Sequence, residues 1–371
     1  MKKLLFGLTA LGLLFLGCEE DTQNRDQELI QDTIDMSDFY VYTSPEENNV
    51  AAKQTNEKSN FKSCFSMQNL NHQLAKNSGL EKKMFDIEHH TRALITAKKG
   101  GNGNGGGRPG GGNGGGEDPI VFEGTVTIPV VVHVLHRAGT NENISSTQIN
   151  NQIKVLNDAF NGTDADSNNI PNEFVGVKAG NINIQFVLND ITRKETNKTS
   201  WPYSSAEEMK HSELGGVDAW DTSKYLNIWV VSQIPYGGGR ILGYAQFPGG
   251  NSETDGVVMD YNDFGTGGTA TYPNNLGKVT VHEVGHWLNL RHIWGDGRCK
   301  QDDFVSDTPN SDRANRGCPL YPTVHCRSND MTMNYMDYTD DRCLFMFTQG
   351  QTDRMRALFA SGGARESFVL P

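Results

Sequence analysis

The sequence predicts an α+β protein, with strands and helices in its central part and a capped helix near its C-terminus. Apolar runs of strand length alternate with helical spacing between residues 126 and 260. A stretch with helical spacing follows at residues 282–292, where histidines and one glutamate stand among apolar residues. A capping-box pattern then marks a last helix after residue 348. The chain of 371 residues is long enough for two or more structural units.

Five segments have the pattern of strands: 126–134, 182–188, 225–231, 243–247 and 256–260. The first, VTIPVVVHV, is apolar almost throughout and is expected to be buried, whereas INIQFVL at 182–188 alternates apolar and polar residues. Helical spacing predicts a helix between the first two strands, on residues Ile149, Ile153, Leu156 and Phe160. The last helix is expected to begin at the Thr348 and Gln351 capping box and to include Met355, Leu358 and Phe359.

The N-terminus predicts export. Residues 1–17 combine two lysines with a run of thirteen apolar residues, Leu4 to Leu16, which is too short to span a bilayer. We interpret it as the signal peptide of a lipoprotein, with cleavage before Cys18 and acylation of that cysteine. A plain secretory signal with an incidental cysteine is the alternative. The first interpretation predicts an outer-membrane or cell-surface protein, with release after maturation left open.

A change in composition divides the rest of the chain. Residues 18–99 are polar and poor in aromatic residues, with weak helical periodicity between Leu70 and Ile95. Residues 100–118 are rich in glycine and too flexible to pack, so they are interpreted as a linker. Exposed flexible segments are cut by proteases, and residues 18–99 are therefore predicted to be a propeptide ahead of a folded domain at 119–371. A stalk that holds the domain away from a membrane is the alternative.

The charge of the chain limits its partners. A net charge of −12 argues against nucleic acid and against an anionic membrane surface. Contact with a membrane is expected only through the N-terminal lipid.

The stretch HEVGHWLNLRH, residues 282–292, carries the strongest chemical signal. His282 and His286 are four residues apart, so a helix presents both from one face, where they can bind one metal ion. In H-E-x-x-H helices the glutamate, here Glu283, acts as general base towards a water at the metal. Catalytic zinc usually takes three protein ligands, which calls for a third residue.

His292 is the candidate for that third ligand. It can reach the same ion if the helix stops and the chain turns, and Asn289 stands where asparagine often adopts the left-handed conformation that ends helices. The spacing fits the longer pattern H-E-x-x-H-x-x-G-x-x-H, with asparagine in the glycine position. A downstream glutamate ligand is nearly excluded, because no glutamate lies between Glu283 and Glu366.

Several further motifs follow in a fixed order: DDFVSDTP, GCP, NYMDYTDDRC and MFTQGQTDRM. Together with HEVGHWLNLRHIWGDG they resemble the pappalysin family of metzincins, in its bacterial, cytophagalysin-like branch. The resemblance covers roughly residues 120 to 365. It implies a zinc endopeptidase with a metzincin-type zincin domain, in which a mixed sheet and the zinc helix lie above the active-site cleft. A loop-rich lower subdomain with a Met-turn and a C-terminal helix completes this architecture, and residues 243–247 become the edge strand beside the cleft.

The resemblance also assigns residues. It implies that His282, His286 and His292 bind zinc, that Glu283 is the base, that Met336 is the Met-turn residue and that Tyr338 assists near the zinc. A phenol there could bond to the oxyanion of the tetrahedral intermediate, and a tyrosine packed under the turn is the alternative. A surface adhesin with a vestigial zincin site is the competing class of function, against which the intact Glu283 argues.

Four of the six cysteines follow the zinc helix. In an exported domain they are expected to form two disulfides, for which three pairings exist, and a second zinc site is the alternative. The family resemblance favours Cys299 with Cys326 and Cys318 with Cys343.

Cys64 is left over after this assignment. A thiolate in the open fourth position of the zinc would exclude water and keep a zymogen silent. Pappalysin-like propeptides carry a cysteine ahead of a helical stretch, usually followed by Gly-Thr, whereas this chain has Phe65-Ser66. A lone thiol without function is the alternative.

Two acidic segments complete the candidate sites. DDFVSDTP, residues 302–309, offers oxygen ligands for calcium, and we select Asp303, the Val305 carbonyl and Thr308. An acidic solvated loop is the alternative. After the Met-turn, Asp341 is expected in the pocket for the side chain that follows the scissile bond, where it would favour arginine. Arg342 would defeat this expectation if it folded inward.

Overall fold

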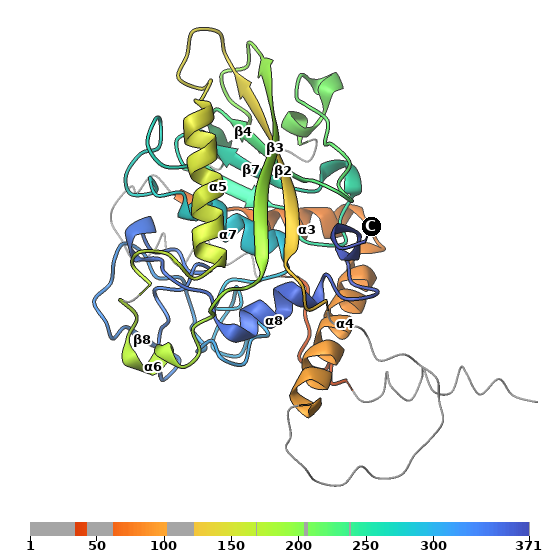
Figure 1. Cartoon of the computed structure of the whole chain (residues 1–371), viewed down its shortest axis with the longest axis vertical. Coiled ribbons are helices and arrows are strands. Elements are labelled where there is room, and N and C mark those ends of the chain that lie inside the picture. The colour runs from red at the N-terminus through yellow and green to blue at the C-terminus, as the bar shows by residue number, and fades with distance from the viewer. Residues whose placement is uncertain are drawn as a thin grey trace, which may run out of the picture.

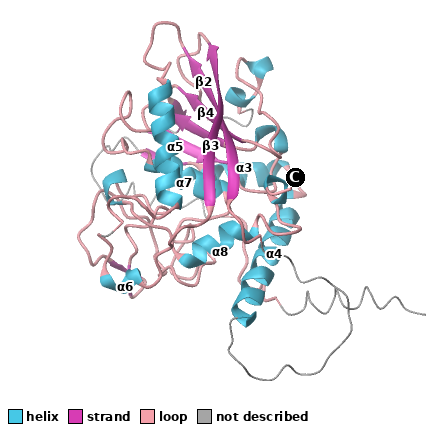
Figure 2. Cartoon of the chain, in the orientation of Figure 1, coloured by secondary structure: helices cyan, strands magenta, loops and turns pink. Residues whose placement is uncertain are grey.

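The computed structural model describes residues 34–42, 62–101, 122–167, 169–203, 207–236 and 239–370. Within these ranges, seven strands form one mixed sheet in the order β1-β6-β7-β4-β2-β3, with β5 paired to β6 (Figures 1 and 2). The strands of this sheet are β1 (Lys62–Cys64), β2 (Val126–His136), β3 (Ile184–Glu195), β4 (Leu226–Val231), β5 (Ile234–Tyr236), β6 (Gly239–Ala245) and β7 (Val257–Asp260). The helices are α3 (Ser66–Lys76), α4 (Leu80–Gly101), α5 (Ser146–Phe160), α6 (Asn172–Val175), α7 (Lys278–Trp287) and α8 (Gln349–Ala357). The predicted α+β class is confirmed.

The main core lies between one face of the sheet and helices α5 and α7. β2 runs parallel to both β3 and β4, and every residue of β4 and β7 is buried. Apolar side chains of β2, such as Val130 and Val132, share one cluster with Leu156 of α5 and Val284 of α7. The opposite face of the sheet forms a second cluster, which Trp201 and Met209 cover. Since α7 packs on the sheet, its position relative to β6 is fixed by this core.

The predicted central elements are present, with one clear difference. β3 begins at Ile184 and continues to Glu195, well beyond the expected end at residue 188. Asn183 has a left-handed backbone with φ of 58°, which leaves Ile182 outside the strand. The second half of β3 pairs with β2 but carries mostly polar residues, as suits the last strand of a sheet. Pattern alone therefore underestimated its length.

Residues 34–42 and 62–101, called the N-terminal segment below, pack against the rest of the chain. β1 pairs in parallel with β6 and covers the edge that the resemblance assigned to residues 243–247. Leu70 and Leu74 of α3 pack in one cluster with Phe247. Helix α4 lies beside α8, far away in sequence (Figure 1). The weak helical periodicity noted in the sequence thus corresponds to two complete helices.

The chain after α7 is mostly loop until α8 begins (Figure 2). It contains one small hairpin, β8 (Val324–His325) with β9 (Ser328–Asn329). The predicted capping box is present at the start of α8. The Thr348 side chain accepts from the Gln351 backbone amide, and the Gln351 side-chain oxygen accepts from the Thr348 backbone amide. Helix α8 ends at Ala357, with Leu358 as its cap, so Phe359 lies just outside it. Among the described residues, no helix combines the length and apolar character needed to cross a bilayer.

Candidate active site

Helix α7 and the turn after it bring three histidines together. His282 and His286 lie on one face of α7, and the helix ends at Trp287. Asn289 then adopts a left-handed backbone with φ of 69°, as its position in the motif predicts. The amide of Leu290 donates to the Gly285 carbonyl at 2.9 Å, which closes the turn and returns the chain to the helix. His292 therefore faces the other two histidines.

The three Nε2 atoms converge on one point. They lie 3.1 Å apart for His282 and His286, 3.1 Å for His286 and His292, and 3.2 Å for His282 and His292. A tetrahedral zinc ion with bonds of about 2.0–2.1 Å holds its ligand atoms roughly 3.3 Å apart. All three side chains are buried. We call these residues the three-histidine cluster, and its geometry fits a zinc ion.

The contacts of the Nδ1 atoms explain why the Nε2 atoms are free to bind a metal. Nδ1 of His282 lies 2.7 Å from the Tyr335 carbonyl, and Nδ1 of His286 lies 2.8 Å from the Leu290 carbonyl. A carbonyl only accepts, so each Nδ1 must carry the proton and each Nε2 presents a lone pair. His292 differs, because its Nδ1 bonds to the Asp296 carboxylate. Burial lowers the pKa of all three rings, which also favours the neutral form that binds metal.

Cys64 of the N-terminal segment joins this cluster. Its Sγ and the three histidine nitrogens all lie within 4.8 Å of one another. The thiol is buried and donates to Glu283 Oε2 at 3.3 Å. Burial and the nearby Glu283 raise the pKa of the Cys64 thiol. A divalent cation at the histidines would have the opposite effect and favour the thiolate.

Glu283 is fully buried beside the cluster. Ser66 donates its hydroxyl to Glu283 Oε2 at 2.6 Å, while Oε1 is buried without a hydrogen-bond partner among the described residues. Burial raises the pKa of Glu283 to about 7, although the bonds from Ser66 and Cys64 oppose that rise. A carboxyl group with such a pKa is suited to exchange protons near neutral pH. Sequence reasoning missed Ser66, whose only signal was its position two residues after Cys64.

Met336 and Tyr338 both lie near the cluster. A side chain at Gly285 would place its Cβ 2.5 Å from Met336 Sδ, so Met336 packs directly against the inner face of α7. The Tyr338 ring centre is 5.6 Å from that of His282 and 4.8 Å from that of His292. Its hydroxyl donates to the Cys64 carbonyl at 3.4 Å. The phenol thus faces the position that Cys64 occupies.

A cavity of about 150 Å³ opens next to Glu283. Asp341 lines it, and the Asp341 Oδ2 atom accepts from the backbone amides of Leu276 at 2.8 Å and Lys278 at 3.2 Å. Burial raises the pKa of Asp341 to about 7, and those two bonds act against the rise. The structure therefore brings Asp341 to the same cavity as Glu283, a position that suits a specificity pocket.

Three cations lie near this cavity, with different orientations. Arg316 lines it and lies over the Tyr338 ring at 5.3 Å. The Arg342 side chain is 58% exposed and lies over the Tyr272 ring at 5.8 Å, which directs it away from the cavity. Lys278 lines the cavity and forms a buried ion pair with Asp164. Burial lowers the pKa of Lys278 to about 8, against the attraction of Asp341. The sequence pointed to Arg342 as the competitor for Asp341, whereas the structure places Lys278 and Arg316 in the lining of the cavity.

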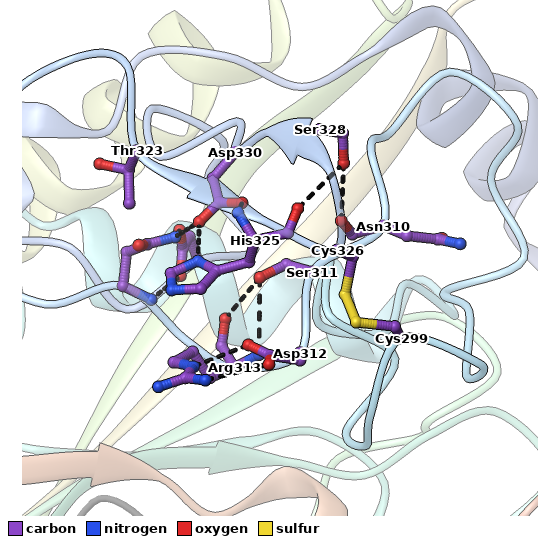
Figure 3. A network of polar contacts seen from close by, with 12 residues as sticks. Cys299, Asn310, Ser311, Asp312, Arg313, Thr323, His325, Cys326, Ser328 and Asp330 are labelled. Atoms are coloured by element: carbon purple, nitrogen blue, oxygen red, sulfur yellow. Dashed lines mark hydrogen bonds and ion pairs between the residues drawn. A yellow bond between two sulfur atoms is a disulfide. The ribbon is translucent and has the colours of Figure 1, made fainter. Parts of the chain in front are cut away.

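The loops below the cluster are linked by disulfides and by a buried polar network. Cys299 is bonded to Cys326 and Cys318 to Cys343, the pairings that the family resemblance implies. These four sulfurs are therefore unavailable to a second zinc ion. Figure 3 shows the neighbourhood of Cys326, where the His325 ring contacts the Asp330 carboxylate.

The same network reaches the Met-turn. The side-chain amide of Asn315 donates to Asp330 at 3.1 Å and to Asp337 at 2.9 Å, and Asp337 lies between Met336 and Tyr338 in sequence. Asn315 thus connects Asp330, which follows the hairpin, to Asp337 beside the Met-turn residue.

The candidate calcium residues also come together. The Thr308 hydroxyl lies 2.8 Å from the Val305 carbonyl oxygen, and 2.8 and 2.9 Å from the two oxygens of Asp303. Asp303 is buried, and burial raises its pKa well above the usual range. Asp307, next to Thr308, has a buried Oδ1 without a hydrogen-bond partner among the described residues. The oxygens of Asp303, Val305 and Thr308 form a compact group of hard ligands.

The chain is similar to known proteins over the region that holds this site. Residues 210–360 match the protein family described as Pregnancy-associated plasma protein-A. An extracellular metalloprotease of Pyricularia oryzae is 34% identical over 246 residues, which cover 64% of this chain and 76% of that protein.

Two solved structures are also similar. Mature mirolysin of Tannerella forsythia, in complex with a cleaved peptide, is 44% identical with a TM-score of 0.62, over 67% of this chain and 96% of that one. A promirolysin mutant of the same organism is 38% identical with a TM-score of 0.67, over 82% of this chain and 95% of that one.

The fold, the three-histidine cluster and these similarities define a zinc metallopeptidase. The family match and the similar proteins identify the group of metallopeptidases. The chain belongs to the pappalysin family.

Proposed function

We propose that this chain is the precursor of an exported zinc endopeptidase in which His282, His286 and His292 hold the metal and Glu283 is the general base. One observation carries the proposal. Three buried Nε2 atoms converge at 3.1–3.2 Å, beside a carboxyl group whose pKa lies near 7 and next to a cavity. Peptide hydrolysis needs a polarised carbonyl, an activated water and a proton acceptor within a few ångströms, and this arrangement provides places for all three.

The residues of the chain divide the chemistry between them. Zinc, when bound, supplies a Lewis acid that polarises a carbonyl and lowers the pKa of water. Glu283 takes the proton from the attacking water and delivers it to the leaving amine, which its pKa near 7 permits. The Tyr338 hydroxyl donates to the oxyanion of the tetrahedral intermediate, from the position where it now faces the Cys64 carbonyl.

Metal removal tests this function. Treatment of the processed enzyme with a zinc chelator should abolish cleavage of a mixed peptide library, and one equivalent of Zn²⁺ should restore it. Internal cuts in the peptides, identified by mass spectrometry, would support an endopeptidase. Cleavage that survives complete removal of zinc would refute the proposal.

We further propose that residues 18–99 form a propeptide and residues 100–118 a linker that is cut during maturation. One contact supports the role of the propeptide. β1 lies along β6 and directs Cys64 into the three-histidine cluster, so the N-terminal segment fills the place of a substrate. Helix α4 runs to Gly101 and so includes the first two residues of the predicted linker, and the other linker residues lie outside the described residues.

A second anchor supports the same role for the N-terminal segment. Glu88 of α4 accepts from Arg354 of α8 at 2.7 and 3.0 Å, with both side chains buried. Burial raises the pKa of Glu88, but the charge and hydrogen bonds of Arg354 and the contacts of Arg92 outweigh it and lower the pKa to about 2. The paired, charged state is therefore kept throughout the physiological pH range, and the segment is held at two distant points.

Replacing Cys64 by Ala should release the enzyme early. The thiol is then absent from the cluster, a water can enter, and the full-length chain should cut itself several-fold faster than the parent. Self-cleavage is followed by gel analysis and by sequencing the new N-terminus. Ser66→Ala is the matched control, because it removes a bond to Glu283 but leaves the thiol in place. A Cys64→Ala precursor as silent as the parent would remove the switch.

Export, lipid attachment at Cys18 and calcium binding complete the proposal. Residues 1–33 lie outside the described residues, so the signal peptide and Cys18 rest on the sequence pattern. The similarity to extracellular metalloproteases supports export. The grouping of Asp303, the Val305 carbonyl and Thr308 supports a structural calcium ion.

A further inference from the structure

We infer that Asp296 is a positioning residue for zinc binding. It orients His292 and gives that ring a negatively charged partner, which the other two histidines lack. The inference rests on the proposed zinc site. His282 and His286 direct their Nδ1 atoms at neutral backbone carbonyls, whereas His292 directs its Nδ1 at a buried carboxylate. Only one of the three rings therefore has a partner whose charge can change the basicity of the ring.

The backbone around Asp296 is shaped to reach His292. Asp296 has a left-handed backbone with φ of 54°, which L-residues rarely adopt, and Gly295 before it has φ of 61°. A Cβ at Gly295 would lie 2.6 Å from the Asp302 amide nitrogen, so this turn requires glycine. Residue 296 could occupy such a turn more easily as glycine, yet it is an aspartate aimed at the ring. Unfavourable backbone of this kind points to a function for the side chain it presents.

The His292 ring is held from a second direction as well. Trp294 stacks on it, with ring centres 4.3 Å apart and planes 5° from parallel. Stacking fixes the plane of the imidazole but permits a flip about the Cβ–Cγ bond, which leaves the ring in the same plane and exchanges its nitrogen and carbon positions. The bond from Nδ1 to Asp296 prevents that flip and directs Nε2 at the other two histidines.

The charge of Asp296 is not neutralised by a direct partner. Its Oδ2 is buried without a hydrogen-bond partner among the described residues. The guanidinium of Arg291 is also buried nearby, but it donates to the carbonyls of Tyr40 at 2.6 Å and Val41 at 3.3 Å in the N-terminal segment. The Asp296 carboxylate is attracted by the Arg291 guanidinium, but its hydrogen-bonded partner is Nδ1 of His292. A more basic imidazole donates more strongly to a metal, and loss of such a partner typically costs about 10-fold to 100-fold in affinity.

The test compares zinc affinities in the full-length chain. Every variant carries Glu283→Gln, so that no form can cut itself, and zinc affinity is measured by competition with a chromophoric chelator. Asp296→Asn keeps the size of the side chain and an oxygen acceptor but removes the charge. It should weaken zinc binding by about 10-fold to 100-fold. Asp296→Ala, which removes the hydrogen bond as well, should weaken it further.

The chain offers a matched control in the His325 and Asp330 pair. Asp330 contacts Nδ1 of a histidine in the same way, but His325 is not part of the three-histidine cluster (Figure 3). Asp330→Asn should therefore leave zinc affinity unchanged. The absorption spectrum of the Co²⁺-substituted protein is the second readout. It should change with Asp296→Asn, because the ligand field that His292 exerts on the metal changes. It should be preserved with Asp330→Asn.

The outcomes separate the possible explanations. A purely structural role would lower the melting temperature of the metal-free and zinc-bound forms equally and leave zinc affinity intact, which would overturn the inference. Tight zinc binding by the parent and equally tight binding by Asp296→Asn would overturn it too, while the proposed function would stand. Failure of the parent itself to bind zinc would overturn both.

Discussion

Replacing Glu283 by Gln is expected to lower kcat for peptide hydrolysis by about a hundredfold to ten-thousandfold, the usual contribution of a general base. Glutamine has the same shape and can still accept from Ser66 and Cys64, so the N-terminal segment should dock as before. It cannot take the proton of the attacking water. The zinc content, measured by atomic absorption, should remain at one ion per chain, because Glu283 is not among the residues of the metal cluster.

Two controls make this result specific. Parent and variant are processed by the same added protease, so that loss of self-cleavage is not mistaken for loss of catalysis. Glu253→Gln removes one carboxylate from an exposed position in the same domain and should leave activity unchanged. Proteolysis by Glu283→Gln at the parental rate would rule out the proposed mechanism.

The metal cluster was predictable from the sequence because its geometry is local. His282, Glu283 and His286 need only the repeat of a helix, and His292 needs only the turn at Asn289. Each relation spans at most ten residues. The capping box at Thr348 was found for the same reason.

The contacts that the sequence did not reveal join distant parts of the chain. Arg291 meets Tyr40 across 251 residues, and Glu88 meets Arg354 across 266. No periodicity connects such pairs, and Arg291, Glu88 and Arg354 each have, alone, the pattern of a surface charge. Asp296 is a different case, since it lies only four residues after His292. It was missed because its orientation depends on a left-handed turn at Gly295 and Asp296, which the letters W-G-D-G do not specify.

The order of the sheet also depended on long-range pairing. The sequence predicted separate strands but could not say that β1, far away in the N-terminal segment, would lie on β6. The three residues of β1 have no strand pattern of their own. Their pairing is set by the free edge of β6 and by the burial of Phe65 and Ser66, which follow.

The processed enzyme is expected to cut before arginine, and Asp341→Asn should remove that preference. Asp341 lines the cavity beside Glu283, where its Oδ2 atom is held by two backbone amides. A guanidinium that enters this cavity would meet a carboxylate already fixed in place, and bidentate geometry favours arginine over lysine. Loss of the charge should lower kcat/KM for arginine substrates by roughly a hundredfold, which corresponds to about 3 kcal/mol.

The effect of pH on this preference follows from the same carboxyl group. Burial raises the pKa of Asp341 to about 7, so the carboxylate is charged above that value and loses its charge as the pH falls through it. The preference for arginine over leucine should therefore be largest above pH 7 and should decrease below it. The Asp341→Asn enzyme should show no such change in preference, because its amide does not titrate.

Lys278 and Arg316 are the cations that could compete with a substrate for Asp341 in this pocket. Both line the cavity, but the Lys278 ammonium is paired with Asp164 and the Arg316 guanidinium lies over the Tyr338 ring, so we expect Asp341 to accept a cationic substrate. Cleavage profiling with a peptide library compares the parent, Asp341→Asn and the matched control Asp340→Asn, whose carboxylate lies 3.9 Å from Arg342. The control should keep the arginine preference. An apolar preference in the parent, or an arginine preference that survives Asp341→Asn, would mean that Lys278 or the backbone determines selectivity in this pocket.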